Sequence, residues 1–171
     1  MSIRLFSILP MVLACTVLSG CGSVNHNLKL KEDYALTQDT RIAVGKVQNA
    51  TGKSFEDIDP EKMLKDALTE ALQEKDLLWT ANGKPVRIDA VIVEYEEGNA
   101  FKRWLLPGWG STVLTVRATL REGDRLIGEA HARRTVSIGG GYSIGAWKSI
   151  FRDVTEDLVS DIQKKLEASS A

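Results

Sequence analysis

Apolar residues are spaced in two different ways along the chain, and the spacing predicts both strands and helices. Apolar and polar residues alternate in four segments, the pattern of a strand with one buried face. These segments are 41–47, 86–95, 112–121 and 125–138. Apolar residues recur every three or four positions in two other stretches, which is the helical period. These stretches run from Pro60 to about Lys75 and from Trp147 to Leu166.

The order of these elements predicts the fold class. The strands and helices follow one another as β-α-β-β-β-α, with three strands grouped in the second half of the chain. Such an order favours an α+β fold with a mostly antiparallel four-stranded sheet and two helices packed on one face. We therefore expect residues 41–171 to form a single α/β domain.

The first twenty residues are expected to be an export signal. A single charge, Arg4, precedes an apolar run of secretory length that is too short for a stable transmembrane helix. The run ends in Leu18-Ser19-Gly20-Cys21, which resembles the lipobox of bacterial lipoproteins. The resemblance implies cleavage between Gly20 and Cys21 and a covalent lipid on Cys21. The alternative, a general secretory signal with an incidental cysteine, predicts no lipid at that position.

The predicted lipid also sets the expected location. Acyl chains on Cys21 would anchor the protein in a membrane, and residues 21–40 are expected to form a tether to the domain. We expect this tether to have a mobile start and an ordered end, since Leu28, Leu30, Tyr34 and Leu36 could lie against the domain. Gly22 stands where an aspartate favours inner-membrane retention in enteric-type lipoproteins. We therefore expect a lipid-anchored protein of the outer membrane that faces the periplasm. Cys15 would leave with the signal, so no disulfide or thiolate metal ligand is expected.

Charge and residue content argue against several function classes. The 22 Lys and Arg residues nearly balance the 23 Asp and Glu residues, so no nucleic-acid partner is expected. The two histidines, His26 and His131, lie apart in the sequence. No Ser/His/Asp set and no pair of carboxylates suited to catalysis is evident. We expect no enzymatic activity, no metal site and no cofactor beyond the lipid on Cys21.

One face of the predicted sheet is polar. Its candidate residues are Arg87, Arg117, Arg121, His131 and Arg133. They could form a docking surface for an anionic partner, or they could simply keep a one-sided sheet solvated.

The connection between residues 97 and 111 is unusually apolar for a loop between two strands. Its candidate contact residues are Phe101, Arg103, Trp104, Leu105 and Trp109. Exposed aromatic and aliphatic side chains beside cationic ones indicate a contact with a protein or a membrane. In the alternative interpretation these side chains fold back as a lid over the core.

Glycine and basic residues of the second half form a loose pattern that points to a family. The pattern comprises Glu97-Gly98-Asn99, the basic pair Lys102-Arg103, Gly108, Gly110-Ser111, the turn Gly139-Gly140-Gly141 and the terminal helix. With it, residues 40–168 resemble an uncharacterised family of proteobacterial lipoproteins, the domain of unknown function 4410. The resemblance implies a small periplasmic α/β domain with no assigned enzymatic activity.

These observations leave two hypotheses for function. In the first, the chain is a membrane-anchored, non-enzymatic lipoprotein that binds an envelope protein or assembles into a homo-oligomer. Its contacts would lie at the sheet edge formed by residues 41–47 and in the 98–110 loop. In the second, it is an accessory domain that holds a small molecule or a glycan between the sheet and the loop.

Overall fold

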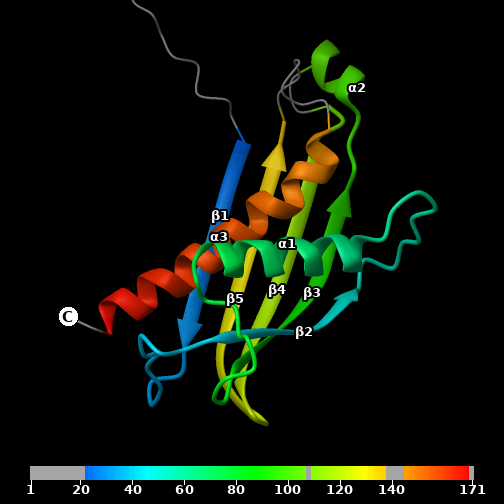
Figure 1. The fold of residues 1–171 in the computed structure, drawn as a ribbon. Coiled ribbons are helices and arrows are strands. Elements are labelled where there is room, and N and C mark those ends of the chain that lie inside the picture. Colours follow the sequence, from blue (N-terminus) through cyan, green and yellow to red (C-terminus); the bar gives the residue numbers. More distant parts are fainter. Residues whose placement is uncertain (1–21, 107–108, 138–144, 170–171) are drawn as a thin grey trace, which may run out of the picture.

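A five-stranded mixed sheet carries two long helices on one face in the computed structural model, which describes residues 22–106, 109–137 and 145–169 (Figure 1). The elements are β1 (Gly22–Leu30), β2 (Ile42–Asn49), α1 (Pro60–Glu74), β3 (Val86–Glu96), α2 (Ala100–Leu105), β4 (Thr112–Glu122), β5 (Arg125–Val136) and α3 (Ala146–Ala168). The predicted α+β class and the two helices on one face agree with this architecture. Both long helices cover the same side of the sheet, and α2 projects from one end of it.

The prediction of a four-stranded, mostly antiparallel sheet was wrong in the number of strands. The sheet has five strands in the order β1-β5-β4-β3-β2. Neighbours pair antiparallel except β2 and β3, which run parallel. This parallel pair requires a crossover, and α1 provides it between the two strands. The sheet is therefore mixed.

The fifth strand, β1, lies in the segment that we expected to be a tether. His26, Leu28 and Leu30 alternate with Asn25, Asn27 and Lys29, a strand period that the polar histidine conceals. His26 faces α3, where its Nδ1 lies 2.7 Å from Asp161 Oδ2. Leu28 is buried in the core, and Leu36 farther along the same segment is buried as well. At least these parts of 21–40 therefore belong to the folded domain.

Capping and apolar spacing agree for α1, whereas α3 has the apolar spacing without a side-chain cap. The Asp59 side chain accepts a hydrogen bond from the Lys62 backbone N–H, and Pro60 occupies the first helical position of α1. Leu64, Leu68 and Leu72 form the buried stripe of this helix. The longer α3 buries its own stripe, which includes Phe151 and Leu158, against α1 and the sheet. Burial of these stripes contributes most of the stability of each helix.

The two ends of the sheet differ, and the difference positions the candidate site. At the end that we call apical, β1 and β4 begin and β3 and β5 end, at Gly22, Thr112, Glu96 and Val136 respectively. At the opposite end, which we call basal, a hairpin turn at Gly123 joins β4 to β5. Within the described ranges, none of the helices combines the length and hydrophobicity needed to cross a bilayer.

Candidate functional site

The apical segment, residues 97–111, connects β3 to β4 and contains α2. Asn99 caps α2, because its side-chain oxygen accepts a hydrogen bond of 3.0 Å from the Lys102 N–H. The Asn99 N–H donates to the Gly110 carbonyl at 2.8 Å. The Thr112 hydroxyl donates to the Glu97 carbonyl at 2.7 Å. These bonds close the base of the segment, so α2 is held as a defined projection.

Gly110 is required by this closed geometry. Its φ of 71° lies in the left-handed region that favours glycine. A Cβ at this position would also stand 2.8 Å from Lys102 Cβ and 3.0 Å from the Asn99 carbonyl oxygen. Any larger residue would therefore disturb the start of α2.

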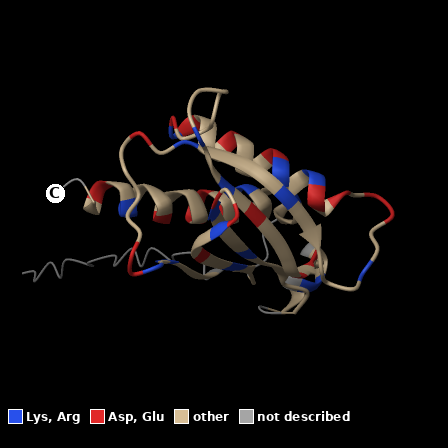
Figure 2. Ribbon diagram, turned by 90° about the horizontal axis from the view of Figure 1, so that it is seen from below, with Lys and Arg blue, Asp and Glu red and all other residues tan. Residues whose placement is uncertain are grey.

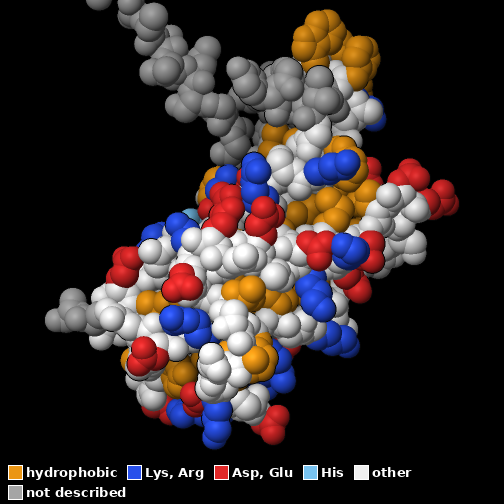
Figure 3. Space-filling view, in the orientation of Figure 1, with side chains coloured by type: hydrophobic (Ala, Val, Ile, Leu, Met, Phe, Trp, Pro, Cys, Tyr) orange, Lys and Arg blue, Asp and Glu red, His pale blue; other side chains and the backbone are white. Residues whose placement is uncertain are grey.

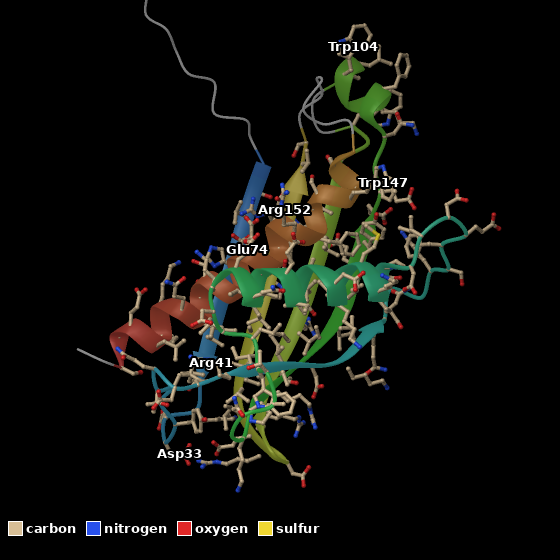
Figure 4. The ribbon with its side chains drawn as sticks, viewed as in Figure 1. Asp33, Arg41, Glu74, Trp104, Trp147 and Arg152 are labelled. Atoms are coloured by element: carbon tan, nitrogen blue, oxygen red, sulfur yellow. The ribbon has the colours of Figure 1, made fainter. Side chains whose placement is uncertain are left out.

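The large apolar side chains of the apical segment project into solvent. Their exposed fractions are 65% for Phe101, 68% for Trp104, 49% for Leu105, 61% for Leu106 and 49% for Trp109. The space-filling view shows them as an apolar tip, and Trp104 stands at its end (Figures 3 and 4). The lid interpretation is therefore wrong, because these side chains do not cover the core.

Side chains of the tip contact one another in two places. The rings of Phe101 and Trp104 lie 6.1 Å apart. Lys102 Nζ lies 5.4 Å from the centre of the Trp109 ring, within reach of a cation–π interaction. An apolar surface with a cation beside it is available for contact with another molecule.

An aromatic cluster supports the segment from below. Tyr95, near the end of β3, has its ring 5.1 Å from that of Phe55 and 5.1 Å from that of Phe151 of α3. The Tyr95 hydroxyl donates to the Trp147 carbonyl at 3.1 Å. Burial raises the pKa of this hydroxyl, so it remains a protonated donor. The cluster joins the start of α3 to the strand that leads into the apical segment.

The predicted polar residues lie together on the sheet face opposite the helices, which we call the open face. The register places Asn25, Arg133, Thr115 and Glu94 in one row across four strands. The next row holds Asn27, His131, Arg117 and Val91, and another aligns Lys29, Glu129, Thr119 and Asp89. Arg121 pairs with Arg87 nearest the basal end. A docking role for this face remains a prediction.

Several charges of the open face are used in local contacts. Asp89 accepts hydrogen bonds from the Lys46 backbone N–H at 2.8 Å and from Arg87 Nε at 3.1 Å. The Asp89–Lys46 bond lies at the β-bulge of β2, where a Cβ on Gly45 would overlap the Asp89 carboxylate. Asp89 thus joins β2 to the sheet.

Glu94 is a second carboxylate of the open face that is held by neighbouring side chains. It accepts a 2.7 Å hydrogen bond from the Thr115 hydroxyl and is paired with Arg133, whose Nε lies at 3.2 Å. The Thr115 hydrogen bond, followed by that of Arg133, lowers the pKa of the Glu94 carboxyl below its ordinary value of 4.5.

Glu94→Gln is expected to destabilise the protein by about 0.5 kcal/mol near pH 7, because the pair is partly exposed. A lowered folded-state pKa contributes stability that is present above the unfolded-state pKa and is lost as the pH falls through the folded-state value. The difference between wild type and variant should therefore shrink below about pH 4.5. Urea unfolding at pH 7 and pH 3 measures it, and a difference that does not change with pH would contradict the assignment.

An open hollow of about 610 Å³ lies on this face between β1, β4 and β5. Its polar lining includes Asn25, Asn27, Lys29, Arg117, Thr119, Glu129 and His131. Among the described residues, no three His, Cys, Asp or Glu side chains are grouped to hold a metal ion. Positive and negative residues are interspersed over the strands and helices (Figure 2). The polar side chains of the open face can form hydrogen bonds with a polar ligand.

A polar cluster between α3 and the sheet was missed by the sequence reasoning. Arg134 donates to both carboxylate oxygens of Asp157, at 2.6 and 2.8 Å, and His26 lies beside Asp161. The hydrogen bonds that Arg134 donates to Asp157 raise the pKa of its guanidinium. The only sequence signal was an arginine and a histidine at core-facing strand positions. The cluster fastens α3 to β1 and β5.

Several predicted residues fall outside the described parts of the chain. These are Gly20, Cys21, Gly108 and the glycine turn at 139–141. The backbone of Arg103 lies in α2, but its side chain is not among those described. The lipid on Cys21 and a contact by Arg103 therefore remain predictions.

Comparisons with known proteins fit this fold. The PelC dodecamer from Paraburkholderia phytofirmans superposes with a TM-score of 0.57 at 15% identity, covering 84% of this chain and 98% of that one. A DUF330 protein from Xanthomonas campestris gives 0.52 at 13% identity, covering 77% and 88% respectively. At these identities the likeness shows the fold alone. No curated protein matches the chain in sequence.

The family is shown by sequence. The model of the domain of unknown function DUF4410 matches residues 37–140, which span β2 to β5 with α1 and the apical segment. The predicted resemblance is thereby confirmed, and the chain belongs to the DUF4410 family.

Proposed function

We propose that the protein is a non-enzymatic, membrane-anchored module of the bacterial cell envelope that acts by contact through its apical segment. The observation that carries the proposal is the group of five large apolar side chains exposed together on α2 and the residues after it. Solvent exposure of so much apolar surface at one point costs solubility, which favours a contact role. The closed base of the segment presents this surface in a fixed position.

The chemistry of the described side chains supports a role without catalysis. The carboxylates with the best-defined partners, Asp89, Glu94 and Asp157, hold strands or α3 in place. His26 is used in the same way. His131 lies on the exposed side of the sheet, in a row with Asn27 and Arg117. A general base needs a substrate proton within reach and a partner that orients it. The row that contains His131 instead has the character of a solvated sheet surface.

Self-assembly is the second part of the proposal. The similar PelC structure is described as a dodecamer. The outer strands β1 and β2 form the two edges of the sheet here, and edge strands are natural sites for pairing between copies. Light scattering over a concentration series would detect an oligomer, whereas a mass that stays at one chain at all concentrations would contradict this part.

The apical contact is tested by a double substitution. Trp104→Ser with Leu106→Ser should leave the free energy of unfolding within about 0.5 kcal/mol of wild type, because both side chains are exposed. It should weaken association with detergent-solubilised envelope components by roughly 30-fold or more, as expected for two central contact residues. The measurement is a quantitative pull-down with purified protein.

The matched control is Val24→Ser, which removes an exposed apolar side chain from β1, outside the apical segment. Binding by this variant should equal that of wild type. Equal binding by the apical double variant would contradict the proposal, and unfolding of that variant would show that the segment is structural.

The anchor is tested by lipid labelling. We expect cells to incorporate labelled fatty acid into the full chain, and we expect Cys21→Ala to abolish the label because only a cysteine sulfur forms the thioether. Fractionation of the labelled cells should place the protein with the outer membrane. Label that persists in Cys21→Ala would contradict the lipid assignment.

A specific observation favours one other function, the accessory binding of a glycan or small molecule. The hollow on the open face has hydrogen-bonding side chains suited to hydroxyl groups. Calorimetric titration would measure the affinity of envelope glycans for wild type and for Arg117→Ala. Because Arg117 lies outside the apical segment, a lower glycan affinity in this variant would support binding at the open face and not at the apical segment.

A further inference from the structure

The register of the sheet sets where the chain enters the domain. Gly22, the first residue of β1, pairs with Val136 of β5, and Val136 pairs with Thr112 of β4. Thr112 directly follows the apical segment. The start of β1 is therefore two strands away from the base of the apical segment, at the same end of the sheet (Figure 1).

The position of β1 determines where a lipid on the preceding residue, Cys21, would enter a membrane. Cys21 lies outside the described residues, but one peptide bond joins it to Gly22. A lipid on Cys21 would thus enter its bilayer close to the apical end, because β1 begins at once and no long linker separates the lipid from the sheet. The proposal that follows rests on the proposed function, and it names the partner of the apical segment.

We propose that the apical segment inserts into the interfacial layer of the same bilayer that holds the acyl chains of Cys21. The partner that the apolar tip contacts is then a lipid surface. The domain would stand with its apical end on the membrane and its basal end in the periplasm.

The composition of the tip fits the interface between headgroups and acyl chains. Tryptophan is enriched at this depth because its ring is amphipathic. Trp104 and Trp109 supply such rings, and Lys102, exposed beside them, can reach lipid phosphates.

The basal end has a different character. Arg125 forms an exposed ion pair with Asp33, and Tyr34 donates to Glu122 at 3.3 Å. Asp33 and Trp104 lie at opposite ends of the molecule (Figure 4). Charged groups of both signs at the basal end suit water, so of the two ends, as far as they are described, the apical one is better suited to lipid.

A second attachment would also fix orientation. One acyl anchor allows the domain to turn about a single point, whereas an anchor together with an inserted tip holds the strands across the membrane plane. The open face and the sheet edges would then face sideways, toward neighbouring molecules in the periplasm.

The test uses the full chain with its acyl chains, purified from the producing cells and reconstituted in phosphatidylethanolamine and phosphatidylglycerol vesicles that contain brominated lipid. Two single-tryptophan reporters are compared. One keeps Trp104 and the other keeps Trp79, with the remaining tryptophans changed to phenylalanine. Trp79 is the matched basal control. Its backbone N–H donates to the carbonyl of Ile42, whose partner Val86 pairs with Glu122 at the end of β4.

We expect bromolipid to quench Trp104 at least about threefold more strongly than Trp79. Equal quenching of the two reporters would overturn the inference, and so would a protein that does not associate with the vesicles. A complementary variant needs fewer changes. Trp104→Phe with Trp109→Phe should lose most of the quenching seen in the wild-type protein, and retention of that quenching would also overturn the inference.

The outcome also separates this inference from the proposed function. If Trp104 is not quenched by lipid but the apical double variant loses binding to a purified envelope protein, the lipid surface is wrong and the contact role stands. If neither effect is found, both are wrong.

Discussion

Phe151→Ala is expected to lower the free energy of unfolding by about 4 kcal/mol, the largest effect of any single substitution considered. Phe151 is 1% exposed and packs its ring on Tyr95. Its removal leaves a cavity between α3 and the sheet and exposes the Tyr95 ring to that cavity. Because Tyr95 precedes the apical segment, the support of that segment should loosen as well.

Urea unfolding followed by circular dichroism measures this loss. Phe151→Leu is the matched control, since it keeps most of the apolar volume and should cost about 1.5 kcal/mol. A loss below about 1 kcal/mol for Phe151→Ala would contradict the packing of α3 described above.

Arg134→Met is expected to lower the free energy of unfolding by about 3 kcal/mol. Asp157 is only 8% exposed, and both of its oxygens accept hydrogen bonds from Arg134. Removal of the guanidinium leaves this carboxylate in a poorly solvated position, where His26 Nε2 at 4.0 Å is a weaker partner. The contact of α3 with β1 and β5 should weaken accordingly.

The chain offers a control for this effect on the same helix. Arg152 and Glu156 form an exposed pair one turn apart, with Arg152 Nε 3.5 Å from Glu156 Oε1. Arg152→Met should change stability by less than about 0.5 kcal/mol, because solvent screens an exposed pair. Similar losses in the two variants would contradict the claim that burial makes the Arg134–Asp157 pair important.

Much of the fold could be predicted because the apolar pattern is regular where side chains are buried on one face. Leu64, Leu68 and Leu72 mark α1, and its observed start at Pro60 agrees with the cap and proline signals. The segments predicted as 86–95 and 112–121 are β3 and β4 within one residue at each end. The parallel pairing of β2 and β3 could not be read, because periodicity within a strand carries no information about its neighbour.

The missed features share a physical cause, which is polar side chains at core-facing positions. His26 interrupts the apolar alternation of β1, yet it is accommodated there by Asp161 on α3. Arg134 does the same on β5 through Asp157. A polar residue at a core-facing strand position can be recognised only when its partner from a distant segment is known. The apical segment is a different case, because its apolar residues were compatible with a contact surface or with a lid over the core, and only the structure shows their side chains exposed.

The most direct test of the apical contact is photo-crosslinking in living cells that carry the full chain. A photoreactive amino acid is placed at Trp104 and, as the matched basal control, at Asp124 in the turn between β4 and β5. The account predicts crosslinks to lipid or to an envelope protein from position 104 and little product from position 124. Equal background labelling at both positions would contradict it.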